Sequence, residues 1–242
     1  MHANIRSSIA CLKSTEKIIS LAKKTNGRLH VFHLSTKEEA KLFDNQNDLK
    51  NKKITSEVCI HHLSFNDADY KTKGNFIKWN PSIKTIEDQN ALWDALISDK
   101  IDVIATDHAP HTFNEKNQLY VDCPSGGPLV QHSLYIMYEH FLEKRISLEK
   151  IVEKMCHNPA ILFNIKKRGF IREGFFADLV ILRKNQSWVI NKNNILYKCG
   201  WSPFEGKKIN SMITHTFVSG NLAYENGVFN QNIMGKKIEF NS

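Results

Sequence analysis

The chain has 242 residues, 41% hydrophobic content and a formal net charge of +8, which predicts one large globular domain or one and a half and excludes a disordered tail. No apolar run approaches the roughly 20 residues of a membrane span and the first residues form no apolar signal-peptide core, so we expect a cytoplasmic protein without membrane contact. Lysine outnumbers arginine by 27 to 6 and is spread along the chain, so we interpret the charge as the composition of an AT-rich gene and expect no nucleic-acid partner.

Helical patterns alternate with short apolar or β-branched runs from about residue 7 to residue 165. This alternation is typical of α/β units around a parallel sheet. The apolar runs predict four strands, at residues 28–34, 54–60, 75–79 and 102–106. The helical patterns predict helices at residues 36–44, 85–98, 127–144, 147–155 and 158–164.

The pattern changes after residue 168. Short runs separated by Gly and Asn turns predict strands at residues 170–174, 177–182, 213–218 and 221–227. We therefore expect two parts, an α/β region over residues 1–167 and a small β subdomain over residues 168–242.

A polar residue stands at the end of each of the four predicted strands: His33, His61, Asn80 and Asp107. In a parallel α/β barrel these strand ends converge on one face, where catalytic residues tend to lie. Taken singly, a histidine at a strand end is most often hydrogen-bonded, and Asp107 could cap a helix. Two imidazoles and a carboxylate at three strand ends instead predict a common metal site, of a kind that suits Zn²⁺.

The cysteines give no sign of a disulfide framework. Their number is odd, they are widely scattered, and none forms a C-x-x-C pair, which also argues against a thiolate zinc site. We expect all five to be reduced. They are Cys11, Cys59, Cys123, Cys156 and Cys199.

Around Asp107 the sequence resembles a known family. The segment Ala105-Thr-Asp-His-Ala-Pro-His-Thr-Phe-Asn-Glu-Lys116 resembles the dihydroorotase signature, in which an Asp and a His bracket Ala-Pro and a Lys follows. The likeness continues from Asn158 to Gly206 and covers nearly every residue. Other segments similar to dihydroorotases are His30-Val-Phe-His-Leu-Ser-Thr36, Glu57-Val-Cys-Ile-His-His-Leu63, Lys78-Trp-Asn-Pro81 and Cys123-Pro-Ser-Gly-Gly-Pro-Leu129.

The resemblance implies a fold and a reaction. It makes residues 1–167 the C-terminal half, with the last four strands, of a TIM-type (β/α)8 metallo-hydrolase barrel, and residues 168–242 a small β-sandwich appendage. The implied enzyme is a metal-dependent hydrolase of cyclic amide C–N bonds. Its small-molecule reaction is the reversible hydrolysis of dihydroorotate to N-carbamoyl-L-aspartate in de novo pyrimidine biosynthesis.

The resemblance also implies roles for five residues. His33, His61 and Asp107 would hold one or two divalent ions, taken to be Zn²⁺, and Asp107 would also be the general base. Asn80 and His111 would contact the substrate. Of the adjacent histidines, His61 matches the family ligand, and His62 would support it.

Two features of the family are absent from the sequence. Dihydroorotases have an H-x-H pair on the first barrel strand and a bridging carboxylated lysine or aspartate on the fourth, whereas His2 is the only histidine before His30. We therefore expect a truncated chain, incomplete alone, that needs an N-terminal complementing chain or a homo-oligomer.

Two alternative functions remain open. A related cyclic amidohydrolase, an allantoinase or hydantoinase, would share the metal histidines and aspartate, although the Asp107 to His111 segment favours dihydroorotase. A non-catalytic dihydroorotase-like scaffold of aspartate carbamoyltransferase is the second alternative, and retention of the five site residues argues against it.

Overall fold

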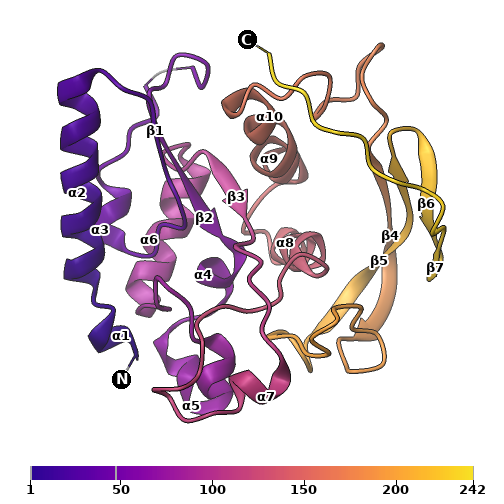
Figure 1. Cartoon of the computed structure of the whole chain (residues 1–242), viewed down its shortest axis with the longest axis horizontal. Helices are drawn as coiled ribbons and strands as arrows, with labels where there is room; N and C mark the ends of the chain where they lie inside the picture. Colours follow the sequence, from indigo (N-terminus) through magenta and orange to yellow (C-terminus); the bar gives the residue numbers. More distant parts are fainter. Residues whose placement is uncertain (1, 47, 242) are drawn as a thin grey trace. The chain divides into compact units, whose positions relative to one another are not determined.

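In the computed structural model, which describes residues 2–46 and 48–241, three short strands form a parallel sheet (Figure 1). The order is β1 (Leu29–Val31), β2 (Ile54–Cys59), β3 (Val103–Ala105). His30 pairs in register with Thr55, and Cys59 pairs with Ala105. Because the strands are parallel, their carboxyl ends lie along one edge of the sheet.

One predicted strand is wrong. Residues 75–79 overlap a 3-10 helix, η2 (Gly74–Ile77), instead of joining the sheet. Residues Ile77, Lys78 and Trp79 are all buried, as the residues of a short interior strand would be. The backbone hydrogen bonds nevertheless go elsewhere: Lys78 N–H donates to Asn75 O at 3.0 Å, and Lys78 O accepts from Gly126 N at 2.9 Å.

Helices follow each strand of the sheet, as α/β units require. Helix α6 matches the predicted helix at residues 85–98 and begins after Thr85, whose side chain forms a capping box with Asp88. Helix α2, for which no range was predicted, ends at Asn26 in the left-handed region. Helix α2 packs against α3 (Figure 1). The bounds are α1 His2–Ile5, α2 Ser8–Thr25, α3 Lys37–Ala40, α4 Ile60–Ser64, η1 Asp67–Asp69, α5 Tyr70–Lys73, α6 Ile86–Ile97 and α7 Phe113–Lys116.

The chain divides into two units, Met1–Leu134 with Ile190–Gly206, and Tyr135–Val189 with Lys207–Ser242. The first unit contains the parallel sheet and all five predicted site residues. The predicted boundary between residues 167 and 168 lies inside the second unit and stays a prediction.

The second unit contains a four-stranded antiparallel sheet, in the order β4-β5-β6-β7. Helix α8 packs on it, because the Tyr135 hydroxyl accepts a hydrogen bond from Ile213 N at 3.0 Å and the Glu139 carboxylate accepts two from Asn210, at 2.7 and 2.8 Å. The bounds are α8 Ser133–Leu142, α9 Leu148–Val152, the π-helical turn η3 Glu153–His157, α10 Asn158–Leu162, β4 Leu179–Val189, β5 Lys208–Val218, β6 Asn221–Glu225 and β7 Val228–Phe229.

Three of the four strands predicted after residue 168 overlap β4, β5 and β6, whereas residues 170–174 form turns. The turn closes where Phe175 N donates to Arg172 O at 3.1 Å, and Gly174 has a φ of 78°. The Arg172 guanidinium lies over the Phe170 ring, and this cation–π contact stabilises the turn, which pairs with no neighbouring strand. No helix in the described part of the chain is long and apolar enough to span a membrane.

Candidate metal centre

His33 and Asp107 each lie two residues beyond the end of a parallel strand. His33 follows β1 and Asp107 follows β3, and both have a left-handed backbone, with φ of 43° and 47°. Non-glycine residues rarely adopt this region, and those that do cluster at functional sites. Both half-buried side chains therefore belong to the edge where strands β1 and β3 end.

His61 is a buried imidazole without a hydrogen-bond partner. It lies in the first turn of α4, directly after β2, with 0% of its surface exposed and neither ring nitrogen hydrogen-bonded. Its ring stacks on the Trp79 indole, with centroids 4.4 Å apart and planes 14° from parallel. Unsatisfied polar atoms of this kind are costly in a protein interior, and they are expected where a side chain is a metal ligand.

Electrostatic interactions connect the residues at the three strand ends. Burial lowers the pKa of His61 well below its usual value, and the neighbouring His62 and His33 imidazoles lower it further. Burial raises the pKa of Asp107, the His33 imidazole opposes that shift, and Glu57 adds to it. His33 is therefore near enough to act on both His61 and Asp107.

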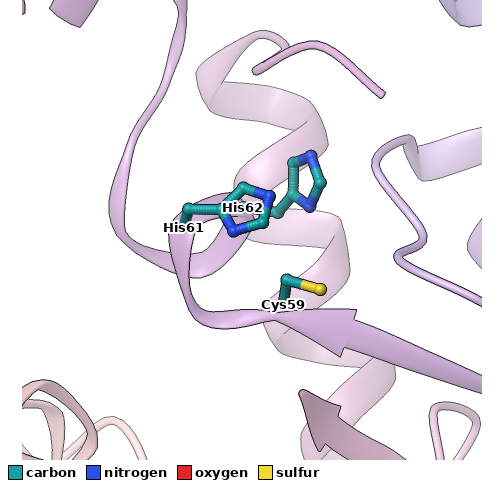
Figure 2. A group of neighbouring side chains, drawn as sticks. All are labelled: Cys59, His61 and His62. Carbon is teal, nitrogen blue, oxygen red and sulfur yellow. The ribbon is translucent and has the colours of Figure 1, made fainter. Parts of the chain in front are cut away.

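The tightest group of candidate ligands is Cys59, His61 and His62. Within the described residues, this is the one set of three or more whose ligand atoms all lie within 4.8 Å of one another, so His33 and Asp107 stand outside it. Figure 2 shows the thiol at the end of the strand and the two imidazoles on the turn that follows. No cysteine was predicted to be a ligand, and the Cys-x-His-His spacing at a strand end is the signal that could have identified Cys59.

The two predicted substrate residues lie in different settings. Asn80 is exposed, directly after the buried Trp79. His111 is half-buried, with Nε2 3.1 Å from Ser125 O, while its own carbonyl accepts a hydrogen bond from Trp201 Nε1 at 2.7 Å. His111 also lines a cavity of about 470 Å³, together with His108, Pro110, Thr112, Glu115, Tyr197, Lys198 and Cys199.

Two buried lysines hold the loop beside His111, and the sequence analysis gave neither a role. Lys116 Nζ donates to Lys78 O at 3.3 Å and to Pro124 O at 2.9 Å, and Lys78 Nζ donates to Tyr120 O at 2.7 Å and to Cys123 O. Burial lowers the pKa of Lys116 to about 8. These bonds attach the loop to the segment that carries Asn80.

The donor set suits a divalent cation. Neutral imidazole nitrogens and carboxylate oxygens are the ligands that zinc and similar ions take in proteins, and the unpartnered nitrogens of His61 fit such an ion. Carboxyl ends of parallel strands are also where α/β folds place their catalytic groups.

Comparisons with known proteins give concordant matches. The sequence profile of the amidohydrolase family matches residues 2–223. A dihydroorotase of Endomicrobium trichonymphae is 36% identical over 208 residues, covering 86% of this chain and 49% of its own length. The chain thus spans about half the length of the curated relatives it matches.

Solved structures show the same fold. The dihydropyrimidinase of Brevibacillus agri superposes with a TM-score of 0.85 at 21% identity, covering 94% of this chain and 51% of its own. An L-hydantoinase of Arthrobacter aurescens superposes with a TM-score of 0.81 at 27% identity, covering 90% of this chain and 49% of its own.

Proposed function

Because this chain belongs to the amidohydrolase family, we propose that it is the C-terminal part of a dihydroorotase that hydrolyses dihydroorotate reversibly to N-carbamoyl-L-aspartate in cytoplasmic pyrimidine synthesis. The proposal includes half of a TIM-type barrel over residues 1–167 and a β-sandwich part over residues 168–242. One observation carries it: His33, His61 and Asp107 follow three adjacent parallel strands in a chain 36% identical to a dihydroorotase.

In this proposal His33, His61 and Asp107 hold one or two divalent cations, with Zn²⁺ as the expected ion. A bound cation would polarise the substrate carbonyl and make water acidic enough to be a nucleophile near neutral pH. The imidazoles serve as neutral donors, because burial disfavours the protonated form of His61.

Asp107 moves the proton. Its carboxylate accepts the proton of the attacking water and delivers it to the ring nitrogen as the C–N bond breaks. Burial raises its pKa, which makes the carboxylate a better base than an exposed aspartate. General-base catalysis of this kind contributes about 10²- to 10⁴-fold to the rate.

Asn80 and His111 orient the anionic substrate. The Ser125 carbonyl accepts a hydrogen bond from His111 Nε2 at 3.1 Å, so this ring nitrogen carries the proton. The Lys78 and Lys116 ammonium groups fix the loop that carries Ser125. A substrate carboxylate that accepted a hydrogen bond from this imidazole would gain a charge-assisted contact.

The complete site needs ligands from outside these 242 residues. The family's H-x-H pair and bridging carboxylate are not in the sequence, and the chain matches 49% of its dihydroorotase relative. We propose that a complementing barrel half supplies them, either from the same polypeptide or from another chain.

Dihydroorotate hydrolysis tests the proposal. The chain is assayed alone and after joining to the part of the Endomicrobium trichonymphae dihydroorotase that it does not match. We expect turnover from the joined protein and a loss of about 10²-fold or more in Asp107→Asn. Asp94→Asn, an exposed aspartate on α6, is the matched control. Full turnover by Asp107→Asn would refute the assigned base, and full turnover by the chain alone would refute the need for a second half.

A hydantoinase is the second candidate, because the solved neighbours include an L-hydantoinase at 27% identity. It is less well supported, since the dihydroorotase relative is 36% identical. Turnover of dihydroorotate, allantoin and hydantoin by the same joined protein separates the candidates. Preference for hydantoin or allantoin would replace the dihydroorotase assignment.

A further inference from the structure

The group of Cys59, His61 and His62 includes two donors, the Cys59 thiol and the His62 imidazole, that the proposed hydrolytic site does not use. The three ligand atoms, one sulfur and two nitrogens, lie within 4.8 Å of one another. All three residues are buried, with 0%, 0% and 3% of their surfaces exposed. In Figure 2 their side chains come from a single turn of the chain, where β2 leads into α4.

Hydrogen bonding identifies the lone pair on His62. Its Nε2 lies 3.2 Å from Pro81 O, and a carbonyl oxygen can only accept, so Nε2 carries the proton. The other nitrogen, Nδ1, therefore presents a lone pair in the neutral ring, and it has no hydrogen-bond partner. Fixing one imidazole nitrogen on a carbonyl in this way is how proteins orient a histidine toward a metal.

His61 contributes a second unpartnered donor. Both of its ring nitrogens are buried without hydrogen bonds. The ring is held between the Trp79 indole on one side and His62, whose centroid is 4.1 Å away. Two orphaned imidazoles beside a buried thiol form a polar cluster that the surrounding apolar core leaves unsatisfied.

The donor types select the cation. One thiolate and two imidazoles favour borderline or soft ions such as Zn²⁺ and Cd²⁺, whereas Mg²⁺ and Ca²⁺ require oxygen ligands. Three protein ligands leave one position of a tetrahedral ion for water. Binding replaces the thiol S–H bond of Cys59 by a sulfur–metal bond and releases that proton to the solvent.

We propose that Cys59, His61 and His62 form a sulfur-containing site for a soft divalent cation, which shares His61 with the proposed hydrolytic site. A neutral imidazole has one lone pair in its ring plane, so His61 serves one cation at a time. Occupation of the sulfur site therefore removes a ligand from the hydrolytic set. The sulfur site itself rests on geometry alone; only this inhibitory consequence rests on the proposed function.

The first test is Co²⁺ titration of the purified chain, read by thiolate-to-metal charge-transfer absorption. We expect one equivalent of Co²⁺ to develop the band. Cys59→Ser should abolish it, and His62→Gln should weaken binding by more than about 10-fold. Cys156→Ser, an exposed cysteine of the second unit, should leave it unchanged. A band that persists in Cys59→Ser, or that disappears in Cys156→Ser, overturns the assignment.

A second measurement needs no variant, so a misfolded Cys59→Ser protein does not spoil the test. The ¹¹³Cd NMR shift of the wild-type chain should show one sulfur ligand and two nitrogen ligands, and a shift typical of oxygen and nitrogen ligands alone contradicts the site. Asp107→Asn should keep the sulfur signal. Because neither readout uses substrate, absence of dihydroorotate turnover would count against the proposed function and leave the cation site standing.

Discussion

At the residue scale, the buried and unpartnered imidazole of His61 is a cost to the cation-free protein. An unsatisfied buried donor or acceptor costs about 1–3 kcal/mol. We expect His61→Phe, which keeps an aromatic ring stacked on Trp79, to raise the free energy of unfolding of the metal-free chain by an amount of this order. Urea denaturation with a chelator present measures it.

His132→Phe is the matched control for that substitution. His132 is also fully buried and its Nε2 is likewise unpartnered, but its Nδ1 lies 3.1 Å from the Ser202 hydroxyl and 3.3 Å from the Tyr197 hydroxyl. Removing this ring leaves both hydroxyls without that partner, so the variant should be destabilised. If His61→Phe were destabilised to the same extent, the unpartnered ring would not be a cost.

His132 should also make the protein sensitive to acid. Burial lowers its pKa from an ordinary 6.5 to about 4. The unfolded chain therefore binds a proton as the pH falls through 6.5, while the folded chain binds it only near 4. The contribution of His132 to the free energy of unfolding is fully present above pH 6.5. It is lost as the pH falls toward 4, at up to about 1.4 kcal/mol per pH unit.

Urea denaturation midpoints between pH 7 and pH 4 measure this dependence. In His132→Asn, the free energy of unfolding should fall less steeply with decreasing pH. The slope should be smaller by the contribution of one proton, roughly 1.4 kcal/mol per pH unit, whatever the variant's stability at pH 7. Burial also lowers the pKa of His62, to about 3, so some decline should remain. An unchanged slope in His132→Asn would contradict the assignment.

Sequence patterns predicted the strand-end positions of part of the proposed site. The residues His33 and Asp107 were identifiable because each follows a short apolar run that forms a strand. Cys59 was not, because it belongs to no C-x-x-C pair and its Cys-x-His-His spacing gains meaning only when the fold places the sulfur beside the two imidazoles. The buried lysines, Lys78 and Lys116, were missed because their partners are backbone carbonyls, which no residue type reveals.

At the element scale, the loop before α8 depends on two glycines. Gly126 has a φ of 128°, and a Cβ added there would lie 2.5 Å from Ala109 O and 3.3 Å from the His111 ring. A Cβ on Gly127 would lie 2.8 Å from the Trp79 ring. The loop therefore approaches the His111 segment closely only because these positions lack side chains.

Gly126→Ala should displace the loop and lower both stability and substrate affinity, with a destabilisation of about 1–3 kcal/mol from strain and overpacking. Gly220→Ala is the control, because Gly220 also has a positive φ, 86°, but has open space around its Cβ position. Urea denaturation compares the two variants. Equal destabilisation would show that backbone strain, and not the close approach, sets the cost.

The elements that sequence predicted best are those with strong local signals. Helix α6 has its capping box at Thr85 and its buried apolar face, strand β3 is a short apolar run, and strand β2 is rich in β-branched residues. Residues 75–79 show the limit of such reasoning. The continuous burial of Ile77, Lys78 and Trp79 arises there from a 3-10 turn packed under a loop, and only tertiary contacts distinguish that from a strand.

At the scale of the whole molecule, the three-stranded parallel sheet fits the partial barrel that we propose. In the described residues its order is β1-β2-β3, so β1 and β3 each pair with another strand on one side only. Exposed strand edges favour pairing with further strands. The solved neighbours are about twice as long, with 51% of the dihydropyrimidinase covered, so we expect the complementing barrel half to add strands at these edges.

The most direct test of the metal centre is a crystal structure of the joined protein grown with Zn²⁺, with the ion located by anomalous scattering. We predict an ion bonded to a ring nitrogen of His33, a ring nitrogen of His61 and a carboxylate oxygen of Asp107, each at about 2.0–2.2 Å. A structure in which these three side chains share no ion, or face different sides of the sheet, would contradict the hydrolytic assignment.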